Sequence, residues 1–253
     1  MSGKLSGKVA VVIGATGIVG SGAVHNFLTE GATVVAVGRD KTKLAALAKK
    51  ESDNKNLIQV VFGDFQDEKA ATGLREAVAK ALPKDAKIDH VVTSVGFVLS
   101  SERPTTDGVK RLQQEFQDGL FPNFVSAQAF IPQLKTREGS SFAFVSGGLS
   151  HFASPDMLNV WTATVKGAAI NALYMTVVAE CAKDGAKVRV GNMCIHHGVA
   201  VHGEDKNQWG MPSTDTWALG AVFSAFAAGS AKGRQLCLED GSKTKEYIAA
   251  VSS

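Results

Sequence analysis

Short apolar runs recur along the chain, and most of them are separated by stretches with helical periodicity. The apolar runs have the length of buried strands and lie at Val9–Ile13, Thr33–Val37, Leu57–Phe62, His90–Val95, Phe142–Val145, Val188–Ile195 and Gln235–Leu238. Candidate helices begin near Gly20, Lys41, Asp67, Val109, Leu158 and Thr214. Near-continuous apolar strands that alternate with helices predict a parallel sheet covered on both faces.

This alternation predicts an α/β fold. Because crossovers between parallel strands are right-handed, the elements would form a doubly wound, Rossmann-type sheet of about seven strands. At 253 residues, with no linker, low-complexity tract or internal repeat, the chain is expected to be one domain. The segment Gly198–Ser213 follows the end of a strand and is the best candidate for a substrate loop.

The most specific motif is a glycine-rich turn after the first strand. Three glycines spaced by three follow Val9–Ile13, and a helical pattern and a second apolar run come next. A dinucleotide pyrophosphate needs such a turn, because glycines let the backbone approach it and a helix N-terminus offers free N–H groups. The alternative is an ordinary tight strand-to-helix turn. The residues expected to contact the nucleotide here are Gly14, Thr16, Gly17, Ile18, Val19 and Gly20.

The end of the second strand bears on which cofactor is preferred. NAD enzymes usually place an acid there to accept from the ribose 2′-hydroxyl. Here Val37 and Gly38 take that place and Arg39 follows, which favours NADP because a guanidinium suits a 2′-phosphate. Arg39 as a plain surface residue is one alternative. Another is a register shifted by two, in which Asp40 would accept from the ribose and favour NAD.

The third strand ends in Gly63-Asp64-Phe65. The Asp64 carboxylate is expected to accept from the adenine amino group, and the Phe65 ring to cover the base. For Asp64, a helix cap is the alternative.

Composition narrows the function classes. The chain is 45% hydrophobic with a net charge of +3, and the basic residues Lys232, Arg234, Lys243 and Lys245 are more typical of a solvated face than of a nucleic-acid site. Its cysteines, Cys181, Cys194 and Cys237, lie in apolar surroundings without CxxC spacing, as expected for reduced core residues of a cytoplasmic protein. The N-terminus lacks an apolar signal region, and no run is long enough to span a membrane.

In this order, the motifs resemble the short-chain dehydrogenase/reductase family over nearly the whole chain. The turn GATGIVG is similar to the extended and atypical branches, Asp64 matches the adenine-contacting Asp, and VVTSVG (91–96) stands at the Asn-Asn-Ala-Gly motif. SAQAFIPQL (126–134) resembles the helix that lines the family's dimer interface, and GRQLCLEDG (233–241) the last strand. The resemblance implies further cofactor contacts from Ser94, Val95, Gly96, Lys166 and Gly198. It also implies a homodimer or homotetramer, paired through the helices within 109–134 and 158–183.

The catalytic pattern departs from the family. Most members use Tyr-x-x-x-Lys on one helix face, with a serine and an asparagine in support. Lys166 matches the lysine, but Thr162 stands at the tyrosine position, and Gly119 and Gly147 at the asparagine and second serine. A threonine hydroxyl is a far weaker acid than a phenol. The supporting serine would then be Ser146 or Ser150, and Lys166 would serve the family role or only bind ribose or make a structural contact.

Three histidines are candidates for the missing proton donor. His196 and His197 lie at the end of a strand beside the expected nicotinamide, and His151 follows the fifth strand. Ordinary loop packing is the alternative for each of them. No pair has secure metal-ligand spacing, so no metal site is predicted; His202 with Glu204 is the weak alternative.

The leading hypothesis is therefore an NADP(H)-binding oxidoreductase that acts on a small, apolar carbonyl or imine compound by an atypical mechanism. Its pocket would be framed by Ser146, His151, Trp161, Thr162, His196 and Trp209. Two alternatives are a non-catalytic NADP-binding sensor or interaction protein and a non-redox cyclase or isomerase.

Overall fold

The computed structural model describes residues 3–51, 55–96, 102–151, 155–207, 213–230 and 235–252. A seven-stranded sheet with the order β3-β2-β1-β4-β5-β6-β9 runs through its centre, and all neighbouring strands are parallel. The strands are β1 (Val9–Ile13), β2 (Thr33–Gly38), β3 (Leu57–Val61), β4 (His90–Thr93), β5 (Ser141–Gly147), β6 (Arg189–Ile195) and β9 (Gln235–Leu238). The predicted doubly wound α/β fold is confirmed.

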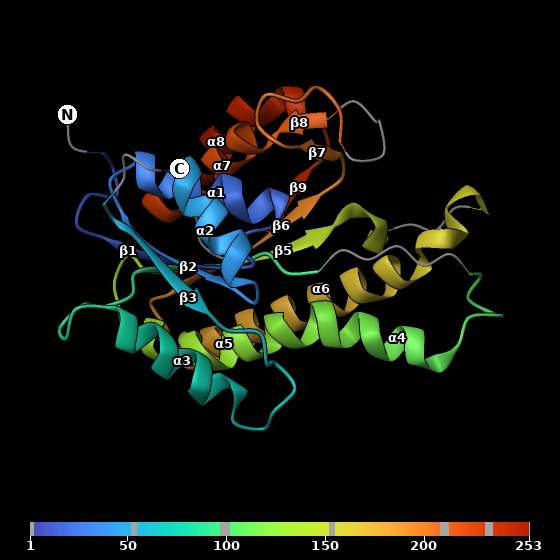
Figure 1. Ribbon diagram of the computed structural model, residues 1–253, viewed down its shortest axis with the longest axis horizontal. Coiled ribbons are helices and arrows are strands. Elements are labelled where there is room, and N and C mark those ends of the chain that lie inside the picture. Colours follow the sequence, from blue (N-terminus) through green and yellow to red (C-terminus); the bar gives the residue numbers. More distant parts are fainter. Residues whose placement is uncertain are drawn as a thin grey trace.

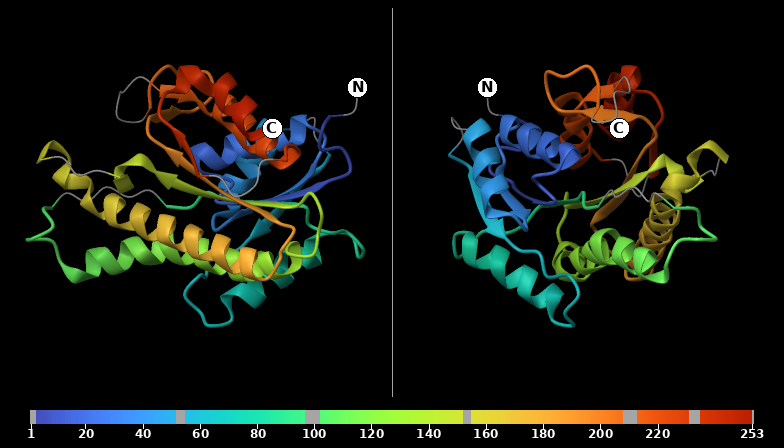
Figure 2. Two further views of the ribbon diagram at one scale, coloured as in Figure 1. Left: turned by 180° about the vertical axis from the view of Figure 1, so that it is seen from behind. Right: turned by 45° about the vertical axis from the view of Figure 1, so that its right-hand side comes forward.

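Helices cover both faces of the sheet (Figure 1). One layer holds α1 (Ile18–Thr29), α2 (Lys41–Lys50), α7 (Thr216–Ala228) and α8 (Thr244–Ser252). The other layer holds α3 (Ala70–Ala81), α4 (Val109–Glu115), α5 (Phe121–Leu134) and α6 (Trp161–Lys183). A π-helical turn, Phe116–Leu120, joins α4 to α5, so that the two form one long rod that lies along α6 (Figure 2).

The inner strands β1, β2, β4, β5 and β6 bury side chains on both of their faces, which explains why they are mostly apolar. Val9, Val11 and Ile13 of β1 belong to the hydrophobic core under α3, α5 and α6. The alternate residues Ala10 and Val12 belong to the core under α1 and α7.

The element boundaries agree with the sequence pattern to within about two residues at most strand ends. The bounds of β1 and β9 are those expected, whereas β4 ends two residues early, at Thr93. The segment Gly198–Ser213 is not loop throughout, because β7 (Gly198–Ala200) pairs with β8 (Ser213–Asp215) in a small separate sheet. The periodicity also missed α8. Trp209, Lys232 and Arg234 lie outside the described residues.

The order of the strands places the ligand crevice. The connections run outward in opposite directions from β1 and β4, and ligands of such sheets bind outside the carboxyl ends of the strands at that point. The glycine turn and the residues after β4, β5 and β6 all lie at this edge.

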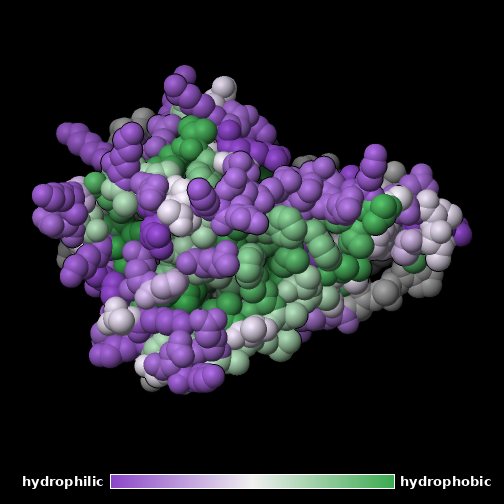
Figure 3. Space-filling model, turned by 90° about the horizontal axis from the view of Figure 1, so that it is seen from below, coloured by the Kyte–Doolittle hydropathy of each residue, from purple (hydrophilic) through white to green (hydrophobic). Residues whose placement is uncertain are grey.

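The outer face of α5 and α6 carries apolar side chains in the open (Figure 3). They are Phe121, Phe124, Val165 and Met175, each between 37% and 59% exposed. Within the described residues, no helix combines the length and apolar character needed to cross a bilayer.

Candidate active site

The glycine turn between β1 and α1 is built from close backbone contacts. Gly14 has φ +80°, and a Cβ there would lie 2.1 Å from the carbonyl oxygen of Ser94. A Cβ on Gly20 would lie 2.1 Å from the carbonyl oxygen of Gly14. Gly17 is the N-cap of α1, and no side chain of the described residues caps it. The first turn of α1, which includes Ile18 and Val19, thus presents its N–H groups as a pyrophosphate site requires, and the turn fits a dinucleotide.

Arg39 follows the end of β2 and is exposed to solvent. Its side chain is 79% exposed, and Nη1 lies 3.6 Å from an Asp118 carboxylate oxygen. A Cβ on Gly63 would lie 2.5 Å from the Arg39 Cβ, so glycine at 63 leaves the space that Arg39 needs. Asp40 instead caps α2, where its carboxylate accepts from the N–H groups of Thr42 and Lys43. The register is the one in which Arg39, and not Asp40, follows the strand directly.

A cavity of about 490 Å³ opens beside the turn. Its wall is formed by the glycine turn, α2 and the start of α7, with Thr16, Gly17, Ile18, Ser21, Lys43, Lys50, His202 and Trp217 among the lining residues. The ring of His202 stacks on Trp217, and its Nδ1 lies 2.7 Å from an Asp215 oxygen. His202 therefore has Asp215 as its carboxylate partner, and the weak metal alternative with Glu204 gains no support.

Asp64 and Phe65 follow β3. The Asp64 carboxylate accepts from the N–H of Gln66 at 3.2 Å in a local turn, and α3 begins only at Ala70, so Asp64 is not the cap of that helix. The half-buried Phe65 ring meets Phe62 edge-on, with the ring centres 5.2 Å apart.

The residues after β4 press against the π-helical turn. The carbonyl group of Ser94 lies against Gly14, and the half-buried Val95 follows Ser94 in the chain. Gly96 has φ +88°, and a Cβ there would lie 2.6 Å from the Gly119 Cα. At Gly119, where the resemblance leads us to expect asparagine, a Cβ would lie 2.2 Å from Lys166 Cδ, so the lysine side chain takes the space of a side chain there.

Lys166 and Thr162 share a buried partner that the sequence did not suggest. Lys166 Nζ lies 3.3 Å from one oxygen of Glu115, and the Thr162 hydroxyl donates to the other at 3.2 Å. All three residues are buried, at 4%, 0% and 1% exposure for Lys166, Thr162 and Glu115. Burial lowers the pKa of Lys166, and the Glu115 charge opposes that shift. In this arrangement the lysine and threonine face α4 and not open solvent. Beside them, Trp161 Nε1 donates to Asp107 at 3.2 Å.

A separate polar cluster surrounds Asn171 of α6. Its Oδ1 accepts from Ser146 at 3.1 Å and from Asn192 at 2.5 Å. Its Nδ2 donates to Ser150 at 2.9 Å and lies 3.1 Å from His151 Nε2. Ser146, one of the two candidates for the family serine, is thus held at the end of β5, and Gly147 beside it faces open space.

The end of β6 brings a cysteine into this cluster. Cys194 is the register partner of Ser146, and its Sγ lies 3.4 Å from His196 Nε2. The His151 and His196 rings lie 5.2 Å apart. Burial, and then the neighbouring His151, lower the pKa of His196. The apolar surroundings of Cys194 in the sequence predict only a core residue, because Ser146 and His151 come from a distant segment.

His197 and Gly198 complete the edge. His197 Nδ1 lies 2.8 Å from the Leu238 carbonyl oxygen, and its buried Nε2 has no hydrogen-bond partner among the described residues. Gly198 begins β7. The candidate residues therefore form three groups: the glycine turn with Arg39, the Glu115–Thr162–Lys166 trio, and the Ser146–His196 cluster.

Comparison with known proteins gives the family of the chain. A family model described as short chain dehydrogenase matches residues 8–201. An NADP-dependent (R)-specific alcohol dehydrogenase of Lentilactobacillus kefiri is 27% identical over 195 residues, which cover 76% of this chain and 74% of the relative. An uncharacterised oxidoreductase of Staphylococcus saprophyticus is 27% identical over 186 residues, or 73% of this chain and 76% of the relative.

Solved structures share the fold at low sequence identity. ElxO with NADP bound superimposes with a TM-score of 0.76 at 14% identity, over 94% of this chain and 99% of the other. A short chain dehydrogenase from Mycobacterium smegmatis gives a TM-score of 0.75 at 19% identity, over 95% and 96%. The chain belongs to the short-chain dehydrogenase/reductase family.

Proposed function

We propose that this protein is an NADP(H)-dependent oxidoreductase that acts on a small, apolar carbonyl or imine compound without the family's tyrosine. The glycine turn carries the proposal. Its backbone leaves no room for side chains at Gly14 and Gly20, and its uncapped helix N-terminus suits a pyrophosphate. Two close-packed glycine positions of this kind are typical of a turn shaped for a dinucleotide.

The preference for NADP rests on Arg39. Its guanidinium is exposed directly after β2, while Asp40, the next residue along the chain, is engaged as a helix cap. A charge-assisted bond to a 2′-phosphate is the interaction that such an arginine makes best. Lys43 borders the same cavity as Thr16 and Gly17 and adds a second positive charge. The NADP in the names of the Lentilactobacillus relative and the ElxO structure supports the same preference.

In this proposal, the substrate binds at the carboxyl ends of β5 and β6. When bound, the nicotinamide supplies or accepts the hydride, so the protein has to position the substrate and balance its proton. Thr162 is enclosed and donates to Glu115, which disfavours it as a proton donor to substrate. Ser146, fixed by Asn171, is the hydroxyl that this chain offers to hold a substrate oxygen or nitrogen.

The proposal is tested first by binding. In calorimetric titrations, NADPH should bind more tightly than NADH, and Arg39→Ala should weaken NADPH about 10- to 100-fold while leaving NADH unchanged. Lys41→Ala, which removes a neighbouring exposed charge, is the matched control and should change neither affinity by more than about twofold. Equal affinities for the two cofactors, or tighter NADH binding, would contradict the NADP assignment.

A non-catalytic NADP-binding protein is the second candidate, because the lysine and threonine of the catalytic helix are closed off by Glu115. Oxidation of NADPH that depends on an added carbonyl or imine separates the two. A screen over small apolar ketones, aldehydes and imines should find such a substrate. Tight NADPH binding without turnover across the screen would favour the non-catalytic protein.

A further inference from the structure

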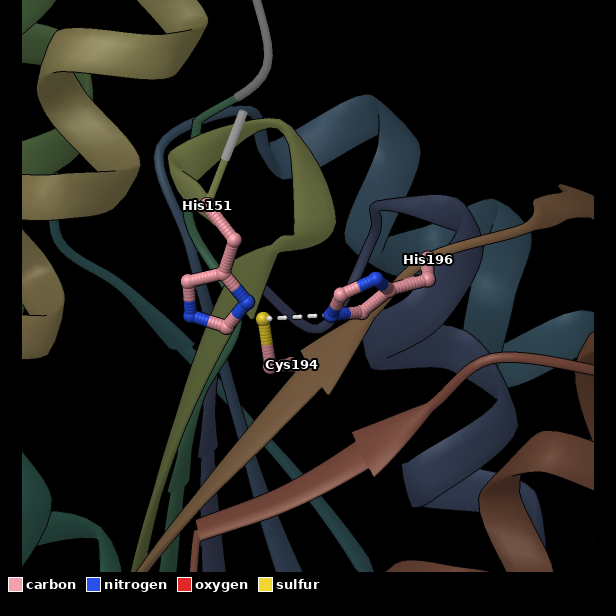
Figure 4. Close-up of side chains that lie close together, drawn as sticks. All are labelled: His151, Cys194 and His196. Atoms are coloured by element: carbon pink, nitrogen blue, oxygen red, sulfur yellow. Dashed lines mark hydrogen bonds between the residues drawn. The ribbon is translucent and has the colours of Figure 1, made fainter. Parts of the chain in front are cut away.

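Three potential metal ligands from two segments meet at the carboxyl end of β6. His151 ends the 3-10 turn Gly148–His151, Cys194 lies within β6, and His196 follows that strand directly. One ligand atom from each lies within 4.8 Å of the other two. Figure 4 shows a ring nitrogen of each histidine directed toward the Cys194 sulfur.

The surroundings hold this arrangement in place. His151 Nε2 lies 3.1 Å from the Asn171 amide nitrogen and 3.2 Å from that of Gln235, so Nδ1 is the atom that faces the sulfur (Figure 4). The backbone N–H of His196 donates to the Leu238 carbonyl at 2.9 Å. A Cβ on Gly148 would lie 2.4 Å from the His196 ring, so glycine leaves space for that ring. Binding through Nδ1 puts the ring proton on Nε2, so the contacts of Nε2 with the two amide nitrogens have to be given up when an ion binds.

We propose that His151, Cys194 and His196 bind one zinc-like divalent ion, with a fourth coordination position open. Two imidazoles and one thiolate are the ligand types that Zn²⁺ prefers, and a three-residue set with one open position is typical of catalytic zinc. Ligand atoms around tetrahedral Zn²⁺ are about 3.3–3.8 Å apart. The present separations therefore need to close by about 1.5 Å at most, within the reach of side-chain rotation for His151, which is exposed.

A role for the open position follows, and this step rests on the proposed function. The site lies beside Ser146, because Cys194 and Ser146 are register partners on neighbouring strands. A carbonyl oxygen on the ion would be polarised toward hydride addition, which is the assistance that the missing phenol would otherwise give. Gly119, Gly147 and Thr162, which stand at the family's other catalytic positions, are compatible with a metal ion taking the place of the phenol.

Cobalt(II) binding to the whole, metal-free protein tests the site without cofactor or substrate. We expect one equivalent to bind, with a sulfur-to-cobalt charge-transfer band in the near ultraviolet and intense visible bands from tetrahedral cobalt. His151→Ala should weaken binding at least about 30-fold, and Cys194→Ser should abolish the charge-transfer band.

Two variants serve as controls. Cys237 pairs with Cys194 in register but lies outside the trio, and His202 pairs with Asp215. Cys237→Ser and His202→Ala should bind cobalt within about twofold of the parent. Circular dichroism shows whether each variant is folded. A wild-type spectrum without the sulfur band, or unchanged affinity in folded His151→Ala, would overturn the site.

The catalytic role has its own readout. If the screen above finds a substrate, removal of the ion should lower kcat at least about tenfold, and Zn²⁺ should restore it. Unchanged turnover after removal of the ion would overturn the catalytic role, whereas cobalt binding alone decides whether the site exists. A protein that binds cobalt as expected but oxidises no NADPH would contradict the proposed function and leave the metal site standing.

Discussion

The two halves of the sheet present their chemistry in different ways. In the half from β1 to β4, the glycine turn offers backbone N–H groups, and its shape is fixed by contacts between Gly14, Gly20 and the Ser94 carbonyl. In the half from β5 to β9, the reactive groups are side chains, and they come from segments far apart in the sequence. Cys194 and His151 are an example.

This difference decides how each half tolerates change. A site built from backbone N–H groups depends on glycines that have no side chain, so one added methyl group disrupts its shape. A side-chain site depends on which groups the fold brings together, so it can change its chemistry while the sheet persists. Thr162 and Gly119 stand where the resemblance to the family leads us to expect tyrosine and asparagine, yet all seven strands keep the parallel order.

The largest effect is expected from Gly14→Ala. The new Cβ would lie 2.1 Å from the Ser94 oxygen, and the left-handed φ of +80° adds strain. We expect NADPH affinity to fall more than about 100-fold and the free energy of unfolding to fall by at least about 3 kcal/mol. Calorimetry and chemical denaturation measure these.

Gly139→Ala is the control for strain alone. Gly139 has φ +74°, but a Cβ there meets nothing within 4 Å among the described residues. It should cost only about 1–2 kcal/mol and leave NADPH binding unchanged. If the two variants behave alike, the turn is not shaped by the contact with Ser94.

Removal of Glu115 should come next in size. Glu115→Ala leaves the Lys166 ammonium buried without its carboxylate, which costs about 3–5 kcal/mol of unfolding free energy. NADPH binding at the glycine turn should change less than about threefold, which would set the two halves apart. The double variant Glu115→Leu with Lys166→Met replaces the pair with apolar groups and should recover most of the stability. A single variant as stable as the parent would mean that Lys166 finds another partner.

Much of the first half could be predicted from the sequence, because its signal is local. Gly14, Gly17 and Gly20 lie within seven residues, and Arg39 follows an apolar run whose end can be located. The second half resisted prediction. Glu115 reads as a surface acid in a helical stretch and Cys194 as a core residue, since their partners Lys166 and His151 are set by the topology of the sheet. Thr162 was identified by its place in a motif, but its bond to Glu115 was not.

The second half also carries the apolar face of α5 and α6. We propose that this face pairs with the same face of a second copy of the chain across a two-fold axis. Phe124 is 45% exposed on this face. Phe124→Glu would place a charge in the interface and should raise the dissociation constant at least about 30-fold. Light scattering at micromolar protein measures the mass. Val61→Glu alters an apolar residue that is 54% exposed at the opposite end of the sheet, and should leave the assembly intact. A wild-type monomer would refute the pairing.

The smallest effect is expected from restoring the family's phenol. In Thr162→Tyr, the ring enters a position that is 0% exposed and bonded to Glu115, so it should cost about 1–3 kcal/mol through overpacking. Ketone reduction should rise less than about tenfold, because Lys166 Nζ is held by Glu115 and because Gly119 and Gly147 lack the supporting groups.

Thr162→Val keeps the size and removes the hydroxyl, and it should leave turnover within about threefold of the parent if that hydroxyl donates only to Glu115. Assays of NADPH oxidation on the same ketones compare the three proteins. A rise well above tenfold in the tyrosine variant would show that the second half still holds the family's geometry and lacks only its acid.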